Sequence, residues 1–548
     1  MKIKSFLLAG LMAMGLTGIA QTAAPENWFN LDQGSDKVAG VSTEKMYKEL
    51  LKDRASQTVV VAVIDSGVDP DHEDLKSVMW VNEDEIPDNG IDDDKNGYID
   101  DIHGWNFIGG KNGENVNHET LEITRLVANY QKKFKGKDAS SLSGKEKKEF
   151  MRYKKLEKKI EDKRKELMDQ GAGYMVFATN LKKVKEMIGK DEITTADLKE
   201  LKTDDAEVKG TADRLMTIMD KQGVSFKEIE GEVAGGAEYF NNQLNYYYNV
   251  EYDPRSVIGD DYSNSYERNY GNADVQGPDA MHGTHVAGII GAVRDNDLGI
   301  KGVADNVRIM SIRAVPDGDE RDKDVANAII YAVDNGASVI NMSFGKGYSW
   351  DKEAVDKAVK YAAKKDVLLV HAAGNSSLNT DEEANFPNDR YEKRGWFRKK
   401  GGKNWLEIGA LSWKEGDDAV ASFSNYAKGN VDLFAPGHHI NSTTPDQGYQ
   451  SLSGTSMASP VTAGVAAVLR SYFPTLTAAQ VKEILMGTTT PLSMKVKKPG
   501  HKDGDELVEF NTLSKSGGVV NAYRAVKKAM VTKGKKKVKK SAKKMVKP

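Results

Sequence analysis

The feature that most restricts the fold of this chain is an unbroken apolar run at residues 59–64, VVVAVI, which ends in Asp65. A run this rich in β-branched residues is typical of a strand buried on both faces, and such strands occur in parallel sheets. In open α/β sheets, ligand sites collect at the carboxyl ends of the strands. Asp65 is therefore a candidate site residue, although an Asp that begins a turn before Ser66 and Gly67 fits the same residues.

The pattern of strands and helices returns after residue 281. Apolar runs predict strands at 307–312, 338–342, 367–371, 405–411 and 431–434, and helices at 323–334, 353–365 and 481–486. Strands that alternate with helices indicate an α/β fold in which helices cover a mainly parallel sheet.

Residues 111–241 differ from the rest of the chain because they are rich in Lys and Glu. Tyr153, Ile160 and Leu167 recur every seven residues, which predicts an amphipathic helix with a charged outer face. We interpret this stretch as an inserted helical subdomain. Both a solvated helical hairpin without chemistry and a surface that recognises a partner or substrate are consistent with it.

The first twenty residues carry a basic start, an apolar run at 6–16 and a small-x-small pattern at 18–20. This is the pattern of a secretory signal peptide, and the run is shorter than the ~20 residues of a membrane-spanning helix. We expect a protein exported to the periplasm or the medium, without a membrane span. Residues 21–57 would form a short N-terminal extension.

The composition limits the choice of partners. The chain has 548 residues and a net charge of only −3, so nucleic acid is not expected as a partner, and the oligomeric state is left open. There is no cysteine, so core burial and bound cations must supply what disulfides give other exported proteins. The Lys-rich tail at 530–548 is interpreted as a solvated end, with a cell-surface or nucleic-acid contact as the alternative.

An acidic loop follows the first strand and has the spacing of a cation-binding loop. Its candidate ligands occupy alternate positions as in an EF-hand and are Asp92, Asp94, Asn96, the carbonyl of Tyr98 and Asp100. Oxygen ligands around one centre suit Ca²⁺, although position 12 is His103 and not the expected Glu. The loop is predicted to be either a structural calcium site or a solvated acidic turn.

A second candidate site residue is Ser456 in the stretch 454–460, GTSMASP, which precedes an apolar run. Ser456 falls where a helix would begin, and Pro460 is expected in the first turn of that helix. The Ser456 backbone N–H would lie at the positive end of the helix dipole, where an anion is stabilised. This position suits a nucleophile, and an ordinary Ser N-cap is the alternative.

His282 opens a small-residue helix and completes a chemical set with Asp65 and Ser456, in the order Asp, His, Ser. Serine is a weak nucleophile until a base takes its proton, imidazole supplies that base, and a buried carboxylate fixes the imidazole tautomer. A zinc site at His282 and His285 is disfavoured because no HExxH pattern is present.

Asn375 ends the strand predicted before it and offers a side-chain amide. Such a donor can face the oxygen of a tetrahedral intermediate beside the Ser456 N–H. An Asn in a turn is the other interpretation of this residue.

Taken together, these stretches resemble the signatures of the subtilisin-like serine proteases, the subtilase family or peptidase S8. The stretches that carry the resemblance are 61–67, 282–288, 341–345, 372–375 and 454–460. The resemblance implies a three-layer α/β/α subtilisin-like fold with the catalytic domain in two parts, 58–110 and 242–529. The helical insertion would separate Asp65 from His282 by 217 residues, so its ends should lie close together.

The resemblance also implies roles for single residues. Ser456 would attack the scissile carbonyl, His282 would act as base and then acid, and Asp65 would orient it. Asn375 and the Ser456 N–H would form the oxyanion hole. Ser343, Phe344 and Gly345 would pair with the substrate, and Asp74 would bind calcium near residues 295–297.

The function that follows from these expectations is an exported serine endopeptidase that hydrolyses protein or peptide substrates through an acyl-enzyme. Calcium would be a structural cofactor, and no organic cofactor is expected. A catalytically inactive subtilase fold that serves as a binding or scaffold protein is the alternative.

Overall fold

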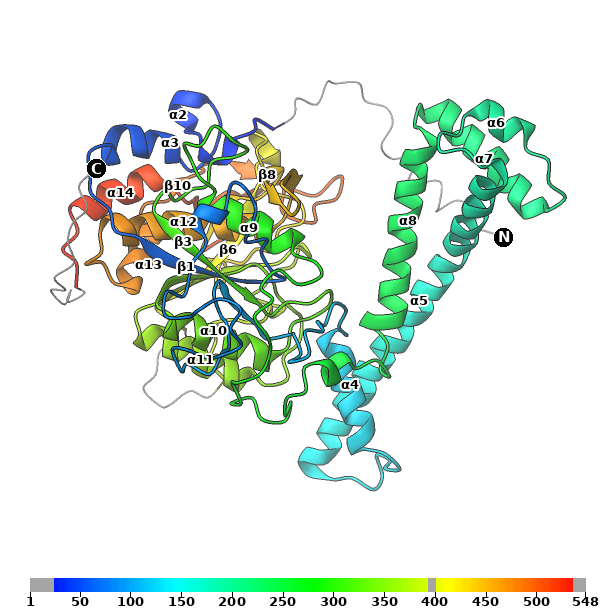
Figure 1. Cartoon of the computed structure of the whole chain (residues 1–548), viewed down its shortest axis with the longest axis horizontal. Coiled ribbons are helices and arrows are strands. Elements are labelled where there is room, and N and C mark those ends of the chain that lie inside the picture. The colour runs from blue at the N-terminus through cyan, green and yellow to red at the C-terminus, as the bar shows by residue number, and fades with distance from the viewer. Residues whose placement is uncertain (1–23, 393–400, 536–548) are drawn as a thin grey trace. The chain divides into compact units, whose positions relative to one another are not determined.

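The computed structural model describes residues 24–392 and 401–535 (Figure 1). The predicted signal peptide, at 1–20, and most of the predicted basic tail, from 536 on, lie outside these residues. The described chain divides into two compact units, Thr124–Tyr252 and a larger unit formed by 24–123 with the residues from 253 on. Each unit is described by itself.

The larger unit is built on a nine-stranded sheet with the order β10-β13-β7-β6-β5-β4-β1-β3-β2. All neighbouring strands are parallel except β10 and β13, so the predicted mainly parallel sheet is confirmed. The strands are β1 (Val59–Asp65), β2 (Gly104–Asn106), β3 (Val307–Arg313), β4 (Ala337–Met342), β5 (Leu368–Ala372), β6 (Trp405–Leu411), β7 (Leu433–Pro436), β10 (Thr490–Pro491) and β13 (Gly518–Val519).

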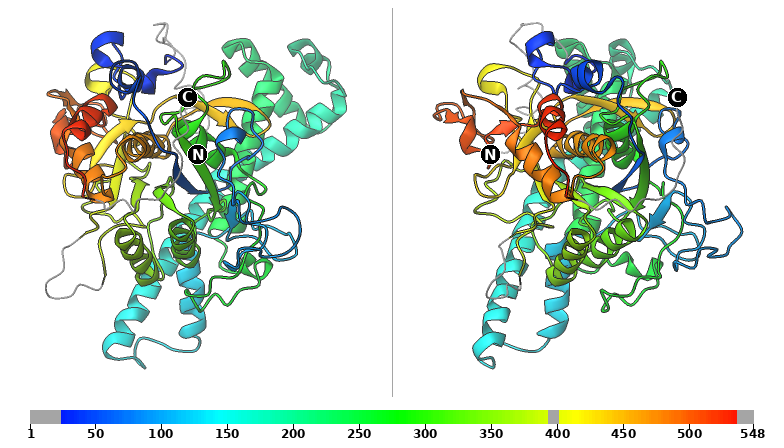
Figure 2. Two further views of the ribbon diagram at one scale, coloured as in Figure 1. Left: turned by 60° about the vertical axis from the view of Figure 1, so that its left-hand side comes forward. Right: turned by 90° about the vertical axis from the view of Figure 1, so that its left-hand side faces the viewer.

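Helices cover both faces of this sheet, which gives three layers (Figures 1 and 2). The strand β1 shows why, because its side chains alternate between two buried cores. Val61 and Val63 pack in the core that contains α9, α12, α13 and α14, and Ala62 and Ile64 pack in the core that contains α10 and α11. The helices are α9 (Met281–Gly291), α10 (Asp322–Asp334), α11 (Lys352–Lys364), α12 (Thr455–Tyr472), α13 (Ala478–Gly487) and α14 (Ala522–Met530).

The N-terminal extension is part of the first of these cores. Trp28, Phe29, Val41 and Met46 are fully buried there, and the Trp28 indole N–H donates to the carbonyl of His439. The extension contains the short helices α2 (Gln33–Asp36) and α3 (Thr43–Met46) and a π-helical turn at Tyr47–Leu51. Its aromatic anchors therefore stabilise the same core as the central strand.

Two antiparallel hairpins and several short turns complete the larger unit. The hairpins are β8 (Ile440–Thr444) with β9 (Gly448–Leu452), and β11 (Lys495–Val496) with β12 (Val508–Glu509). Single 3₁₀ turns lie at Trp28–Asn30, Lys76–Val78, Pro254–Val257, Gly416–Asp418 and Phe510–Thr512.

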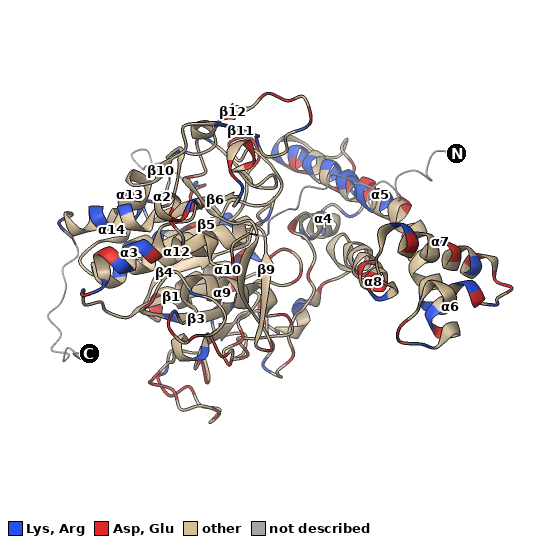
Figure 3. Ribbon diagram, turned by 90° about the horizontal axis from the view of Figure 1, so that it is seen from above, with Lys and Arg blue, Asp and Glu red and all other residues tan. Residues whose placement is uncertain are grey.

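The regular elements of the smaller unit are all helices, in line with the helical composition of the predicted insertion at 111–241. Its helices are α5 (Gly144–Ile188), α6 (Thr195–Glu200), α7 (Ala206–Gln222) and α8 (Phe226–Asn242), with most of α4 (Glu122–Lys133) and a π-helical turn at Gln243–Tyr247. The predicted seam of α5 is correct, because Tyr153, Ile160 and Leu167 are all buried. Its charged face is visible as the Lys and Arg residues along α5 (Figure 3).

An apolar cluster formed by residues of α5, α6, α7 and α8 stabilises this helical unit. It includes Val184, Leu198 and Leu215. Among the residues that the structure describes, none of the helices combines the length and the apolar character needed to cross a membrane.

Candidate active site

A cleft of about 350 Å³ lies where β1, β4 and β5 end and where α9 and α12 begin. This is the edge at which the sequence predicts a site, because carboxyl ends of parallel strands meet there. Its lining includes Asp65, Asn117, His282, Pro316, Gly318, Glu320, Ser343, Phe344, Gly345, Asn375 and Ser456. The structure thus brings all the predicted catalytic, oxyanion and substrate-binding residues together.

Asp65 and His282 form a close polar pair in the cleft. Asp65 is the last residue of β1, with a side chain only 2% exposed, and His282 is the second residue of α9. The Asp65 Oδ1 lies 2.6 Å from His282 Nδ1 and also accepts the N–H of Ser66 at 2.8 Å. This contact directs Nε2, the other ring nitrogen of His282, away from Asp65.

The pKa of His282 reflects two opposing influences. Burial lowers the pKa of the imidazole, but the neighbouring Asp65 carboxylate outweighs it, and the pKa of His282 is raised above its ordinary value. The same carboxylate stabilises the imidazolium that would form when His282 accepts a proton.

Ser456 is the second residue of α12. Its hydroxyl donates to the carbonyl of Ser343 at 3.0 Å, and the Ser343 hydroxyl donates to the Ser456 carbonyl at 2.8 Å. Among the described residues no hydrogen bond links Ser456 to His282, because the Ser456 hydroxyl is directed to the Ser343 carbonyl. Apo structures commonly show such loose catalytic contacts.

Pro460 explains why the Ser456 carbonyl is available. The prediction that Pro460 lies in the first turn is wrong, because α12 begins at Thr455 and Pro460 therefore stands in its second turn. In a regular helix the carbonyl of Ser456 would accept the N–H of residue 460, which proline lacks. The carbonyl instead accepts the Ser343 hydroxyl, which ties the start of α12 to the end of β4.

Asn375 lies beside Ser456 with its side chain fixed by Thr455. The Asn375 Oδ1 accepts the N–H of Thr455 at 2.8 Å and its hydroxyl at 2.9 Å. With the oxygen engaged, the Nδ2 amide is the group available as a donor, and it lies next to Gly454. The role of Thr455 was not predicted, since a Thr before a candidate nucleophile has no distinctive sequence signal.

These residues match a known family along most of the chain. The Subtilase family, Peptidase S8, matches residues 56–512. The chain belongs to the subtilase family. The curated relatives include the thermophilic serine proteinase of Bacillus sp. (strain AK1), which is 36% identical over 266 residues that make up 48% of this chain and 53% of the relative.

Two further curated relatives match smaller shares of the chain. Subtilisin DY of Bacillus licheniformis is 39% identical over 215 residues, which are 38% of this chain and 71% of the relative. Thermitase of Thermoactinomyces vulgaris is 39% identical over 191 residues, which are 35% of this chain and 61% of the relative. The chain thus spans about half to seven tenths of the length of these relatives.

Among solved structures, a cold adapted subtilisin-like serine proteinase is 31% identical, with a TM-score of 0.34 and coverage of 46% of this chain and 76% of that chain.

Arg313 is a cleft residue of this subtilase that sequence reasoning missed. It lies opposite Asp65 in the pairing of β3 with β1, and its side chain is 1% exposed. Its guanidinium donates to the carbonyls of Ser66, at 2.9 Å, and Val116, at 2.6 Å. Burial lowers the pKa of Arg313 to about 10. A lone Arg at the end of a strand gives no sign in the sequence that it will support the residue after the candidate catalytic Asp.

The acidic loop contains a group of three carboxylates that could hold a metal ion, formed by Glu85, Asp92 and Asp94. Their ligand oxygens lie within 4.8 Å of one another. The loop curls around Asp92, whose carboxylate accepts the N–H groups of Asn96 and Gly97. Three carboxylates are the donor set that a hard cation such as Ca²⁺ prefers.

The remaining predicted ligands of this loop are placed differently. Asn96 stays beside the group and donates to Asp94 at 3.0 Å, and the Tyr98 carbonyl as a ligand stays a prediction. The Asp100 carboxylate accepts the N–H groups of Asn89 and Gly90 and lies outside the group of three. Glu85 was missed because it precedes the repeating pattern by seven residues.

Asp74, the other predicted calcium ligand, is buried, and both of its oxygens accept hydrogen bonds. Asn296 donates to Oδ1 at 2.7 Å and the Ile300 N–H to Oδ2 at 3.2 Å. Asn296 lies within the predicted stretch 295–297, and Ile300 lies beyond it. Among the described residues, however, Asp74 joins no group of three acidic or histidine side chains, and a calcium site there stays a prediction.

Proposed function

We propose that this subtilase is an exported serine endopeptidase that cleaves proteins and peptides through an acyl-enzyme. The observation that carries the proposal is the Asp65–His282 contact of 2.6 Å in the same cleft as Ser456 and Asn375. Four side chains with complementary roles in one cleft suit acyl transfer better than a purely binding function.

The chemistry assigns one role to each group. His282 would accept the Ser456 proton as the hydroxyl attacks the substrate carbonyl and would later pass it to the leaving amine. Asp65 would hold the imidazole in the required tautomer. The Asn375 amide and the Ser456 N–H would donate to the oxyanion, which is where preorganised donors contribute most to the rate.

An extended substrate has a natural place in the cleft. Ser343, Phe344 and Gly345 directly follow β4 and line the cleft, so their backbone can pair with a peptide as an added strand. Pairing through backbone groups suits cleavage within a chain and gives little selectivity by itself. We therefore propose unfolded proteins and flexible segments as substrates.

Calcium and export complete the proposal. The group formed by Glu85, Asp92 and Asp94 would bind Ca²⁺ and hold the acidic loop in one conformation. The signal-peptide pattern at 1–20 supports export, and the N-terminal sequence of the mature protein would test it. Retention of the first twenty residues in the mature protein would contradict export by this route.

The deciding experiment compares casein cleavage by the full chain with that by Ser456→Ala. The matched control is Ser451→Ala, an exposed serine on β9 outside the cleft lining. We expect cleavage and fluorophosphonate labelling by the parent chain and the control and neither by Ser456→Ala. A folded parent chain that neither cleaves nor labels would instead favour the inactive binding or scaffold protein.

A further inference from the structure

Two buried, positively charged side chains directly follow the two walls of the cleft in the sequence. The first wall is residues 316–320 and the second wall is residues 343–345, both of which line the cleft. Lys346 follows the second wall, with a side chain 1% exposed, and Arg321 follows the first wall, with a side chain 4% exposed. A buried charge is costly unless it is paired, so the partners of these two residues matter.

Lys346 connects the two walls to each other. Its ammonium donates to the carbonyl of Glu320, in the first wall, at 2.6 Å. It also lies 2.8 Å from Glu122 Oε2 and 2.9 Å from Asp322 Oδ1. Since Lys346 itself continues the second wall, this one ammonium fixes the separation of the walls.

Arg321 connects the first wall to both segments that lead to the helical unit. The entry segment is residues 117–122 and the exit segment is residues 253–270. The Arg321 guanidinium lies 2.6 Å from Glu119, in the entry segment, and 2.9 Å from Asp253, in the exit segment. The two segments therefore meet at one side chain, as expected for an insertion that leaves the catalytic residues in place.

The entry segment also pairs with the first wall through its backbone. The Asp317 N–H donates to the carbonyl of Asn117, and the Glu119 N–H donates to the carbonyl of Asp317, both at 2.8 Å. Gly318 allows this close approach, because a Cβ there would lie 2.3 Å from the Glu119 carbonyl oxygen. The first wall is thus held on its outer edge by the entry segment.

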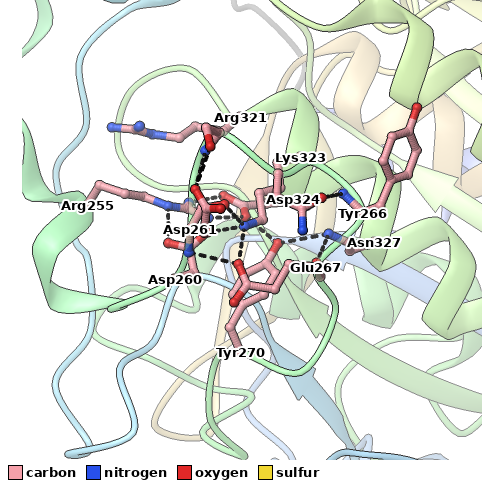
Figure 4. Close-up of polar contacts among 12 residues, drawn as sticks. Arg255, Asp260, Asp261, Tyr266, Glu267, Tyr270, Arg321, Lys323, Asp324 and Asn327 are labelled. Carbon is pink, nitrogen blue, oxygen red and sulfur yellow. Dashed lines mark hydrogen bonds and ion pairs between the residues drawn. The ribbon is translucent and has the colours of Figure 1, made fainter.

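The exit segment is anchored to the start of α10 by a second set of buried charges (Figure 4). Arg255 contacts Asp260 at 2.5 Å and Asp324 at 2.6 Å, and Lys323 contacts Asp260 at 2.5 Å. Tyr270 also donates to Asp324 at 2.7 Å. Because α10 begins immediately after Arg321, these contacts fix the position of the residues that directly follow the first wall.

We propose that Lys346 and Arg321 are positioning residues that set the width of the substrate groove by fastening both cleft walls to the entry and exit segments. This inference rests on the proposed peptidase function. Directional ionic hydrogen bonds define one separation of the walls, whereas apolar packing would tolerate sliding. The binding of substrate residues that lie along the groove, away from the reacting bond, will therefore depend on this width. The chemistry at the reacting bond will depend on it less.

The test uses Arg321→Lys in the full chain, because Lys keeps the charge but loses the two-branched guanidinium. The substrates are a fluorogenic peptide of six residues and an ester of a single acylated amino acid. We expect the KM of the peptide to rise about tenfold relative to that of the ester, with kcat changing less than KM. Glu122→Gln, which keeps the size of the Lys346 partner, should shift the peptide KM in the same direction.

The matched control is Arg470→Lys, a buried arginine that binds Asp366 and the carbonyl of Leu476 away from the cleft lining. For Arg470→Lys we expect a lower melting temperature and an unchanged ratio of the KM values of the two substrates. If Arg321→Lys lowers the melting temperature like the control and leaves the ratio of the two KM values unchanged, the positioning role is wrong. A parent chain that hydrolyses neither substrate would overturn the proposed function itself.

Discussion

The hydroxyl of Ser456 and the hydroxyl of Ser343 each donate to the backbone carbonyl of the other residue, at 3.0 and 2.8 Å. The candidate nucleophile therefore rests against the second cleft wall and not against His282. A substrate strand that pairs with the second wall would compete for the Ser343 carbonyl. Its arrival would release the Ser456 hydroxyl to turn toward His282, which would link substrate binding to activation of the candidate nucleophile.

Asp65→Asn should lower kcat by about 10⁴, because an amide holds the wrong imidazole tautomer. It should also move the acid limb of kcat/KM to lower pH. His282 must be neutral to act as a base, so activity falls as the pH drops through the pKa of His282, which Asp65 raises. Without that carboxylate, burial is opposed only by the smaller effect of Asp279, and the pKa of His282 falls. If the acid limb of Asp65→Asn lies at the same pH as that of the parent chain, the assignment of Asp65 as the partner of His282 is contradicted.

Asn375→Leu should remove one oxyanion donor and leave the substrate groove in place. For subtilisin, a member of the same family, loss of such a donor costs about 10²–10³ in kcat. We expect a loss of that size with KM changed less than threefold. Thr455 anchors the side-chain oxygen of Asn375, so Thr455→Val should give a smaller loss in the same direction. An equal effect of Asn375→Leu on KM and kcat would indicate distortion of the groove instead.

Gly283→Ala should impair activity through packing alone. A Cβ at this position in α9 would lie 2.0 Å from the Gly67 carbonyl oxygen and 3.2 Å from Asp65 Cβ, so the helix must move away from β1. The Asp65–His282 contact would lengthen, and we expect kcat/KM to fall at least tenfold, with about 1–3 kcal/mol lost in stability. Gly210→Ala in α7 is the control, since open space surrounds that Cβ and alanine favours helix.

Calcium should stabilise the folded chain. If the acidic group binds Ca²⁺, an ion concentration of 100 times Kd adds about 2.7 kcal/mol to the free energy of unfolding. We expect calcium to raise the melting temperature of the parent chain and a chelator to reverse the rise. Asp92→Asn should abolish the response, whereas Glu83→Gln, an exposed acid outside the group, should retain it. An equal rise in melting temperature with calcium in Asp92→Asn and Glu83→Gln would contradict the proposed calcium site.

The sequence predicts those parts of the molecule whose signals are local. The apolar run of β1 and the periodicity of α5 identify their elements because burial imposes a fixed period on consecutive residues. The residues Asp65, His282, Ser456 and Asn375 were found in the same way, since each stands where a strand ends or a helix starts. Their meeting in one cleft then follows from the rule that parallel strands share a carboxyl edge.

The remaining site residues were not predictable, because their signals depend on partners far away in the chain. Lys346 and Glu122 are 224 residues apart, and neither shows in the sequence that the other will neutralise it. Glu85 joins the acidic group from outside the loop pattern. Pro460 was assigned to the wrong turn because the first residue of a helix is uncertain by one or two positions.

The position of β1 between β3 and β4 affects the state of the chain during its synthesis on the ribosome. The partners β3 and β4 follow this strand by about 250 and about 280 residues, which a ribosome adds in roughly 12–56 s at the usual rate of elongation. Until β3 is made, this apolar strand has no neighbours in its sheet. Until both partners are made, the growing chain lacks the sheet edge at which the candidate active-site residues meet.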